Sequence, residues 1–263
     1  MDLFRATREF TYLGFFDALY FSGVTATVLG YGDITPMSDT LQIVSFLQSG
    51  FGFAILTCVV TYIISVVSGV TDRNILSLRM WTETDRTGDG VLTVIQALSD
   101  EEPVYFRLRL QTLLDNVYHI QPKMQQFPIL DIFYRSKDPV FSPEIMIRSV
   151  TELAIAAQIV SADPKHRGLK TSAEKLGEAS VEIMKLITLQ YLSKQARSRL
   201  KNPVFEKEDE ARLEQIWSRL TQALPDLQLE NAPHNKQTLQ TIYRLRIFLN
   251  EMKHFSEWDR DEL

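Results

Sequence analysis

The 263-residue chain has a single cysteine, Cys58, so it can form neither an internal disulfide framework nor a metal site built from several cysteines. The four histidines lie far apart, without the spacing of metal ligands; they are His119, His166, His234 and His254. The sequence also lacks the GxSxG, HExxH, GxGxxG and P-loop motifs. We therefore expect no enzyme activity, no cofactor and no bound metal.

Charged residues are absent from Thr40 to Thr71. From Asp72 onward, 26 Lys plus Arg nearly balance 28 Asp plus Glu, so we expect no basic surface that binds nucleic acid. The uncharged stretch has the length of a membrane helix, because a bilayer core of about 30 Å requires roughly 20 apolar residues. We predict a transmembrane helix over Leu41 to Val70, with excess length for tilt or for an extension beyond the lipid bilayer.

A glycine-rich sequence precedes this helix. Residues 25–33 read Thr-Ala-Thr-Val-Leu-Gly-Tyr-Gly-Asp, between an apolar segment that starts at Asp17 and the sequence Ile-Thr-Pro at 34–36. A cation in a narrow pore exchanges its water shell for fixed oxygens, and channel filters supply rings of backbone carbonyls. Such alignment requires restricted or left-handed backbone angles, which Gly30 and Gly32 reach without steric cost. A tight turn that caps a buried helix is the alternative.

This order of segments resembles the pore helix, selectivity filter and inner helix of potassium channels of the two-transmembrane-helix type, from about residue 17 to residue 70. The resemblance implies a homotetramer in the cell membrane that conducts K⁺ passively, with K⁺ as the transported ion. It implies that backbone carbonyls of five residues coordinate the ion; they are Val28, Leu29, Gly30, Tyr31 and Gly32. Asp33 then lies at the outer pore mouth, and the ring of Tyr31 packs against the pore helix. Gly52 resembles a gating hinge, and close packing between membrane helices is its alternative role.

Three positions depart from the commonest pattern of that family. Val28 replaces the threonine that lines the innermost ion site, Leu29 replaces a valine behind the filter, and Val24 replaces a glutamate that would be a partner for Asp33. A weakly selective cation channel is therefore an alternative to a K⁺ channel. A second alternative is a non-conducting regulatory or interaction subunit with a vestigial pore element.

Channels of this type have an outer helix before the pore helix. The pre-pore segment, residues 1–16, is too short and too polar to span a membrane, and it lacks the apolar core of a signal peptide. We expect the chain to be a fragment or a mis-started product of a longer protein; a degenerate subunit is the alternative.

The remaining sequence predicts an all-α protein with a helical cytoplasmic domain. We divide the chain into residues 1–16, a pore domain at 17–71, a linker at 72–101 and a helical domain at 102–263. Apolar periodicity and start signals predict five helices in the last domain; they run over about 104–126, 143–162, 169–200, 208–224 and 236–253. The aromatic, proline-marked segment 125–143 also resembles the tail of some bacterial pore-domain channels.

One sequence in the linker has part of an EF-hand pattern. Asp85, Thr87 and Asp89 occupy positions 1, 3 and 5 of such a loop, and Gly90 occupies position 6. Position 12 is Gln96, where a bidentate glutamate normally binds Ca²⁺. The alternative to a weak metal site is an Asp- and Gly-rich turn before the next helix.

Overall fold

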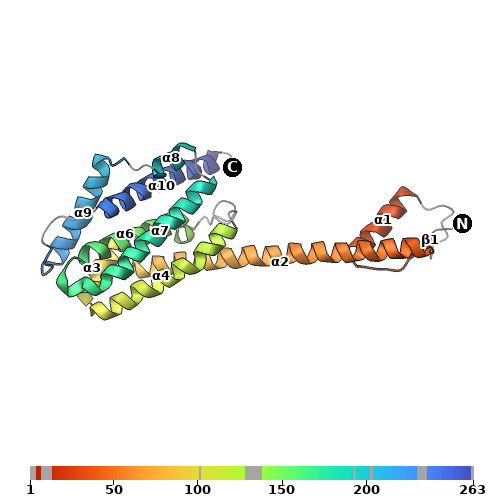
Figure 1. Cartoon of the computed structure of the whole chain (residues 1–263), viewed down its shortest axis with the longest axis horizontal. Helices are drawn as coiled ribbons and strands as arrows, with labels where there is room; N and C mark the ends of the chain where they lie inside the picture. The colour runs from red at the N-terminus through yellow and green to blue at the C-terminus, as the bar shows by residue number, and fades with distance from the viewer. Residues whose placement is uncertain are drawn as a thin grey trace. The chain divides into compact units, whose positions relative to one another are not determined.

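The computed structural model describes residues 4–6, 14–100, 102–127, 138–191, 194–201, 204–229 and 236–261. The chain forms two compact units, Met1–Val67 and Ser68–Leu263. The described parts of both are mostly helical, which confirms the expected all-α class (Figure 1). His234 and residues 128–137 of the aromatic segment lie outside the described residues.

The first unit holds a short helix, a small sheet and the first part of a long helix. Strand β1 (Phe4–Ala6) pairs antiparallel with β2 (Ile34–Pro36), in the register Phe4 to Pro36 and Ala6 to Ile34. Helix α1 (Phe15–Ala26) begins after Gly14, whose backbone N–H donates to Asp17 Oδ2 at 2.9 Å. Because Asp17 lies in the first turn, its carboxylate satisfies a backbone donor that the helix leaves unpaired.

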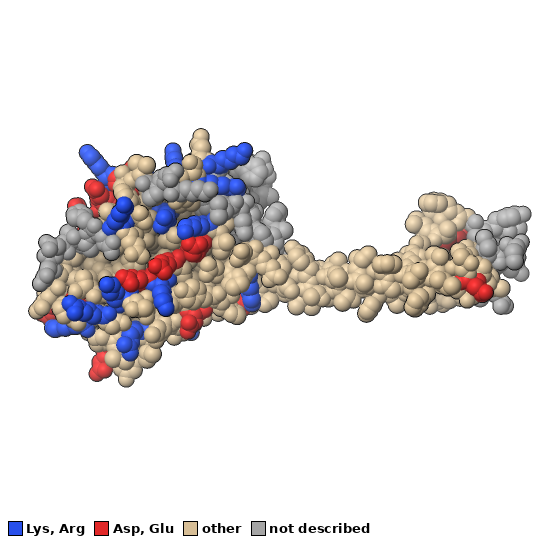
Figure 2. All heavy atoms as spheres, in the orientation of Figure 1, with Lys and Arg blue, Asp and Glu red and all other residues tan. Residues whose placement is uncertain are grey.

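Helix α2 (Asp39–Glu83) has 45 residues and belongs to both units. It confirms the predicted membrane helix and continues past it, since about 20 residues suffice to span a bilayer. Among the described residues it is the one helix long and apolar enough to cross a membrane. Large apolar side chains such as Phe46, Phe51 and Ile64 are exposed. Figure 2 shows no charged side chains on the surface of this stretch of the helix. This surface therefore suits lipid or other protein chains.

The second unit is a helical bundle around α6 (Pro143–Val160). Ser142 caps this helix, Pro143 starts it, and most of its side chains are buried, with Ala154, Ile155, Ala156 and Ala157 fully so. The other elements are α3 (Gly90–Asp100), α4 (Pro103–Gln126), η1 (Pro139–Phe141), η2 (Pro164–Leu169), α7 (Lys170–Tyr191), α8 (Lys194–Lys201), α9 (Lys207–Ala223) and α10 (Lys236–Asp261). Helices α3, α7, α9 and α10 all pack against α6. The small residues of α6 allow this close packing on several sides.

The predicted helices agree with α4, α6, α9 and α10, although α10 continues beyond residue 253. The predicted helix over 169–200 is described as α7 and α8, and residues 192–193 between them lie outside the described residues. Helix α3 was not predicted. It begins at Gly90, where a Cβ would lie 2.2 Å from the carbonyl oxygen of Ser149. Glycine therefore permits the start of α3 to contact the backbone of α6. The helix was missed because the Asp- and Gly-rich sequence at its start is typical of a turn.

Buried acidic groups connect elements of this bundle. Asp209 is fully buried, and both of its carboxylate oxygens accept hydrogen bonds from the Arg246 guanidinium, at 2.8 and 3.0 Å. Asp163 is also buried, and its carboxylate accepts backbone N–H groups of Lys165 at 2.7 Å and Gln228 at 2.8 Å. Burial opposes the charge of Asp163, but these two hydrogen bonds outweigh burial and lower its pKa below the usual range.

We expect Asp163→Asn to destabilise the second unit by about 1–3 kcal/mol at pH 7, because an amide nitrogen replaces one of the two acceptor oxygens. The lowered pKa means that the charged group stabilises the fold above about pH 4, and that this stabilisation is lost as pH falls through the folded-state pKa. Thermal unfolding should therefore separate Asp163→Asn from wild type at pH 7, and the difference should shrink as pH falls below about 4 through the folded-state pKa. Asp226→Asn, at an exposed position, is the control; equal effects of both changes at pH 7 would contradict this assignment.

Candidate functional site

The glycine-rich segment begins at the end of α1 and stays attached to its last turn. The Thr27 hydroxyl donates to the carbonyl oxygen of Gly23 at 2.8 Å. The backbone N–H of Val28 donates to Thr25 O at 3.2 Å, and that of Leu29 donates to Val24 O at 3.0 Å. The start of the segment is therefore positioned by the C-terminal end of α1.

The backbone of this segment alternates in hand. Val28, Gly30 and Gly32 have φ values of 61°, 55° and 76°, whereas Leu29 and Tyr31 between them have negative φ. The left-handed angles expected at both glycines are confirmed. Val28 shares them, although a β-branched residue with positive φ is a rare outlier. Val28 lies two residues before Gly30, just as Gly30 lies two residues before Gly32. This spacing was the signal in the sequence for a third positive φ.

The side chains of the segment are largely uncovered in a single chain. Exposed fractions are 50% for Val28, 58% for Leu29 and 67% for Tyr31. The packing of Tyr31 against the pore helix stays a prediction, since two thirds of its side chain is uncovered in one chain. Large apolar side chains at such exposure indicate a surface that another molecule covers.

Asp33 has a partner that the sequence analysis missed. The hydroxyl of Tyr20 on α1 donates to Asp33 Oδ2 at 2.8 Å. Tyr20 lies one helical turn before Val24, the position where a glutamate was expected and is lacking. The Tyr20 hydroxyl therefore binds the Asp33 carboxylate from the face of α1 that Val24 also occupies. This contact does not require a second acidic group.

Helix α2 supports the end of α1 from the other side. Gln48 Nε2 donates to Ser22 O at 3.1 Å and to Ser22 Oγ at 2.5 Å. At Gly52, an added Cβ would lie 1.8 Å from the carbonyl oxygen of Ala26, the last residue of α1. This contact favours the close-packing role of Gly52, and α2 is helical on both sides of it. The hinge role stays a prediction.

Comparison with known proteins identifies the first unit. A family model described as an ion channel (Ion_trans_2) matches residues 2–69. These residues are an ion-channel domain. The match is to an ion-channel family and not to an enzyme family. Together with the membrane-length helix, it shows that the chain is a membrane protein.

A relative supports the same conclusion. Over 57 residues the chain is 37% identical to the uncharacterized membrane protein YdjJ of Bacillus subtilis (strain 168). The aligned part is 22% of this chain and 17% of YdjJ, so the chain spans a small part of the relative's length. No solved structure matches this chain.

Beyond the ion-channel domain, the EF-hand-like loop uses its oxygens within the fold. Asp85 Oδ2 accepts a hydrogen bond from Gln96 Nε2 at 2.7 Å, and the Thr87 hydroxyl donates to Thr84 O at 2.6 Å. Asp89 Oδ1 accepts the backbone N–H groups of Val91 and Leu92, both at 3.0 Å, at the start of α3.

Asp89 also pairs with Arg219 of α9, at 2.6 Å. Burial opposes the charge of Asp89, but the hydrogen bond from Arg219 and the two backbone groups outweigh burial and lower its pKa. Among the described residues, no group of three acidic, histidine or cysteine side chains could hold a metal ion. These contacts support the alternative of a turn and helix cap.

We expect Gly52→Ala to lower the thermal stability of the ion-channel domain, because its methyl group overlaps the Ala26 carbonyl and forces α1 and α2 apart. Gly50→Ala is a matched control in the same helix, since a Cβ there meets nothing within 4 Å. Thermal unfolding of the detergent-solubilised protein measures both. If Gly52→Ala melts at the temperature of Gly50→Ala, the close contact does not exist.

We expect calcium at about 1–5 mM to leave the melting temperature of the second unit unchanged, because the loop lacks a carboxylate at position 12 and its acidic groups already have partners. The measurement compares melts in calcium with melts in a chelator. A calcium-dependent rise in melting temperature that Asp85→Asn removes would establish a metal site instead.

Proposed function

We propose that the chain is a pore-forming subunit that conducts K⁺ passively across the cell membrane. The single observation that carries the proposal is the alternating backbone at Val28, Gly30 and Gly32, inside an ion-channel domain. In an extended strand successive carbonyls point to opposite sides. Residues of alternating hand turn successive carbonyls to the same side. A row of carbonyls on one side is the arrangement that replaces the hydration shell of a cation.

The proposal assigns a role to each residue of the segment. The backbone carbonyls of five residues line the ion path; they are Val28, Leu29, Gly30, Tyr31 and Gly32. Asp33, held by Tyr20, forms an acidic ring at the outer mouth, where it concentrates cations. Because irregular backbone is tolerated at membrane depth only inside protein or beside water, this segment lies at the centre of an assembly and not against lipid.

The assembly we propose is a homotetramer. One chain supplies one row of carbonyls and cannot enclose an ion, whereas four copies around an axis form closed rings. The exposure of Leu29 and Tyr31 in the single chain supports this assembly, since neighbouring copies would cover these side chains. The second unit, which carries nearly all the charge, is then the cytoplasmic domain.

A weakly selective cation channel remains the second candidate because of Val28. A valine there provides a carbonyl but no hydroxyl, so the innermost ion site has fewer oxygens. Reversal potentials in K⁺ and Na⁺ gradients separate the two candidates. A potential near the K⁺ equilibrium value supports a K⁺ channel, and a potential near zero in opposing K⁺ and Na⁺ solutions supports weak selectivity.

We expect Gly30→Ala to abolish K⁺ flux in proteoliposomes. A Cβ at this position meets nothing within 4 Å, so its effect is not a clash with a neighbour. The cost comes from the left-handed backbone, about 1–2 kcal/mol for a non-glycine residue, repeated in each copy of the ring. The matched control is Gly23→Ala in α1, which also has open space but no positive φ. Normal flux through Gly30→Ala, or equal loss in both variants, would refute the proposed filter.

A further inference from the structure

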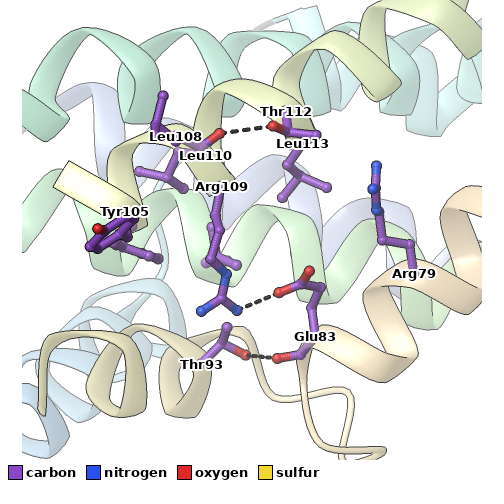
Figure 3. A pocket seen from close by; sticks show the side chains of 11 residues that line it. Arg79, Glu83, Thr93, Tyr105, Leu108, Arg109, Leu110, Thr112 and Leu113 are labelled. Carbon is purple, nitrogen blue, oxygen red and sulfur yellow. Dashed lines mark hydrogen bonds and ion pairs between the residues drawn. The ribbon is translucent and has the colours of Figure 1, made fainter. Parts of the chain in front are cut away.

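The second unit contains a cavity that the proposed channel function does not use. Its volume is about 410 Å³, and its walls come from the end of α2 and from α3, α4 and α6 (Figure 3). Pockets that bind small molecules have volumes of roughly 300–1,000 Å³, apolar walls and a few polar groups in fixed positions. All the residues that line this cavity belong to one compact unit.

The floor of the cavity is apolar. Phe106, Leu110 and Leu113 of α4 and Leu153 of α6 line it, and all four are buried in the core of the bundle. Tyr105 and Leu108 stand at its rim, with exposed fractions of 61% and 51%. These two side chains offer an apolar surface to a ligand at the mouth of the cavity.

The charged side chains that line the cavity include more positive than negative groups. The guanidinium of Arg109 forms an ion pair with Glu83, and the Thr93 hydroxyl donates to the backbone carbonyl of Glu83 at 3.3 Å. Figure 3 shows this ion pair between Tyr105 on one side and Arg79 on the other. Among the described residues, Arg79 has no hydrogen-bond or ion-pair partner. Two arginines and one glutamate therefore leave one positive charge uncompensated.

We propose that this cavity binds a small amphipathic monocarboxylate, an apolar body that carries one carboxylate group. The apolar body lies between the floor and the side chains of Tyr105 and Leu108. The carboxylate pairs with the planar guanidinium of Arg79, which can donate two parallel hydrogen bonds to it. A single negative charge neutralises the cavity, whereas a phosphate monoester carries close to two charges at pH 7. The site is independent of whether the ion-channel domain selects K⁺.

The test is titration calorimetry on the full-length protein in lipid nanodiscs, with empty nanodiscs as the blank. The probes are 4-phenylbutyrate, the alcohol 4-phenylbutanol and the cation 4-phenylbutylamine, which share a phenyl ring on a four-carbon chain. We expect saturable binding of one 4-phenylbutyrate per chain, about tenfold or more tighter than the alcohol or the amine. Shortening the acid to 3-phenylpropionate should weaken binding by about threefold to fourfold, because one buried methylene is lost.

Arg79→Gln tests the assigned anion partner. We expect this variant to bind 4-phenylbutyrate no more tightly than the alcohol, while Arg107→Gln, at an exposed position of α4 outside the cavity, keeps the wild-type affinity. Arg79 has no partner in the described part of the fold, so its removal should leave the melting temperature unchanged. Equal binding of the acid and the amine by wild type, unchanged affinity in Arg79→Gln, or no saturable binding would each overturn the proposal.

Discussion

The contact between Gly52 of α2 and the backbone of Ala26 determines where α1 ends against the long helix. An added Cβ would lie 1.8 Å from the Ala26 carbonyl oxygen, so no side chain fits between the two backbones at this point. Small residues permit such an approach between membrane helices, where no hydrophobic force brings helices together. The segment that follows Ala26 then begins at a defined point, with Val28 and Leu29 hydrogen-bonded to the last turn of α1.

That starting point matters because the segment has little support of its own. Val28, Leu29 and Tyr31 are exposed in one chain, and Val28 adopts a left-handed backbone angle that is costly for side chains larger than glycine. The hydrogen bond from Tyr20 to Asp33 holds the far end of the segment to α1, and the pairing of β1 with β2 follows directly after it. Fixed points at both ends allow a strained backbone to persist between them. Packing against other copies, as we propose for the assembly, would supply the remaining support for the segment.

The second unit differs from the first because it has a large buried core of its own. Helix α6 lies in the middle of that core, and its small side chains admit neighbours on several sides. The acidic groups that become buried there, Asp163 and Asp209, each accept at least two hydrogen bonds, as charged groups must when they leave water. Asp89 accepts hydrogen bonds in the same way at the start of α3, which favours a turn and helix cap over the metal-ligand role that its spacing suggested.

Local patterns in the sequence were enough to predict much of this protein. The lack of charge from Thr40 to Thr71 predicted the membrane helix, Ser142 and Pro143 predicted the start of α6, and the two glycines of the filter-like motif predicted left-handed backbone. These features depend on a few neighbouring residues, so sequence alone determines them.

The tertiary structure decided the contacts between segments. The start of α3 at Gly90 lies against the backbone of α6, and only glycine permits this contact. The Tyr20 hydroxyl takes the place of a carboxylate as the partner of Asp33. Gly52 is in close contact because the Ala26 carbonyl lies opposite it. Each of these depends on residues distant in the chain, whose approach no local pattern records.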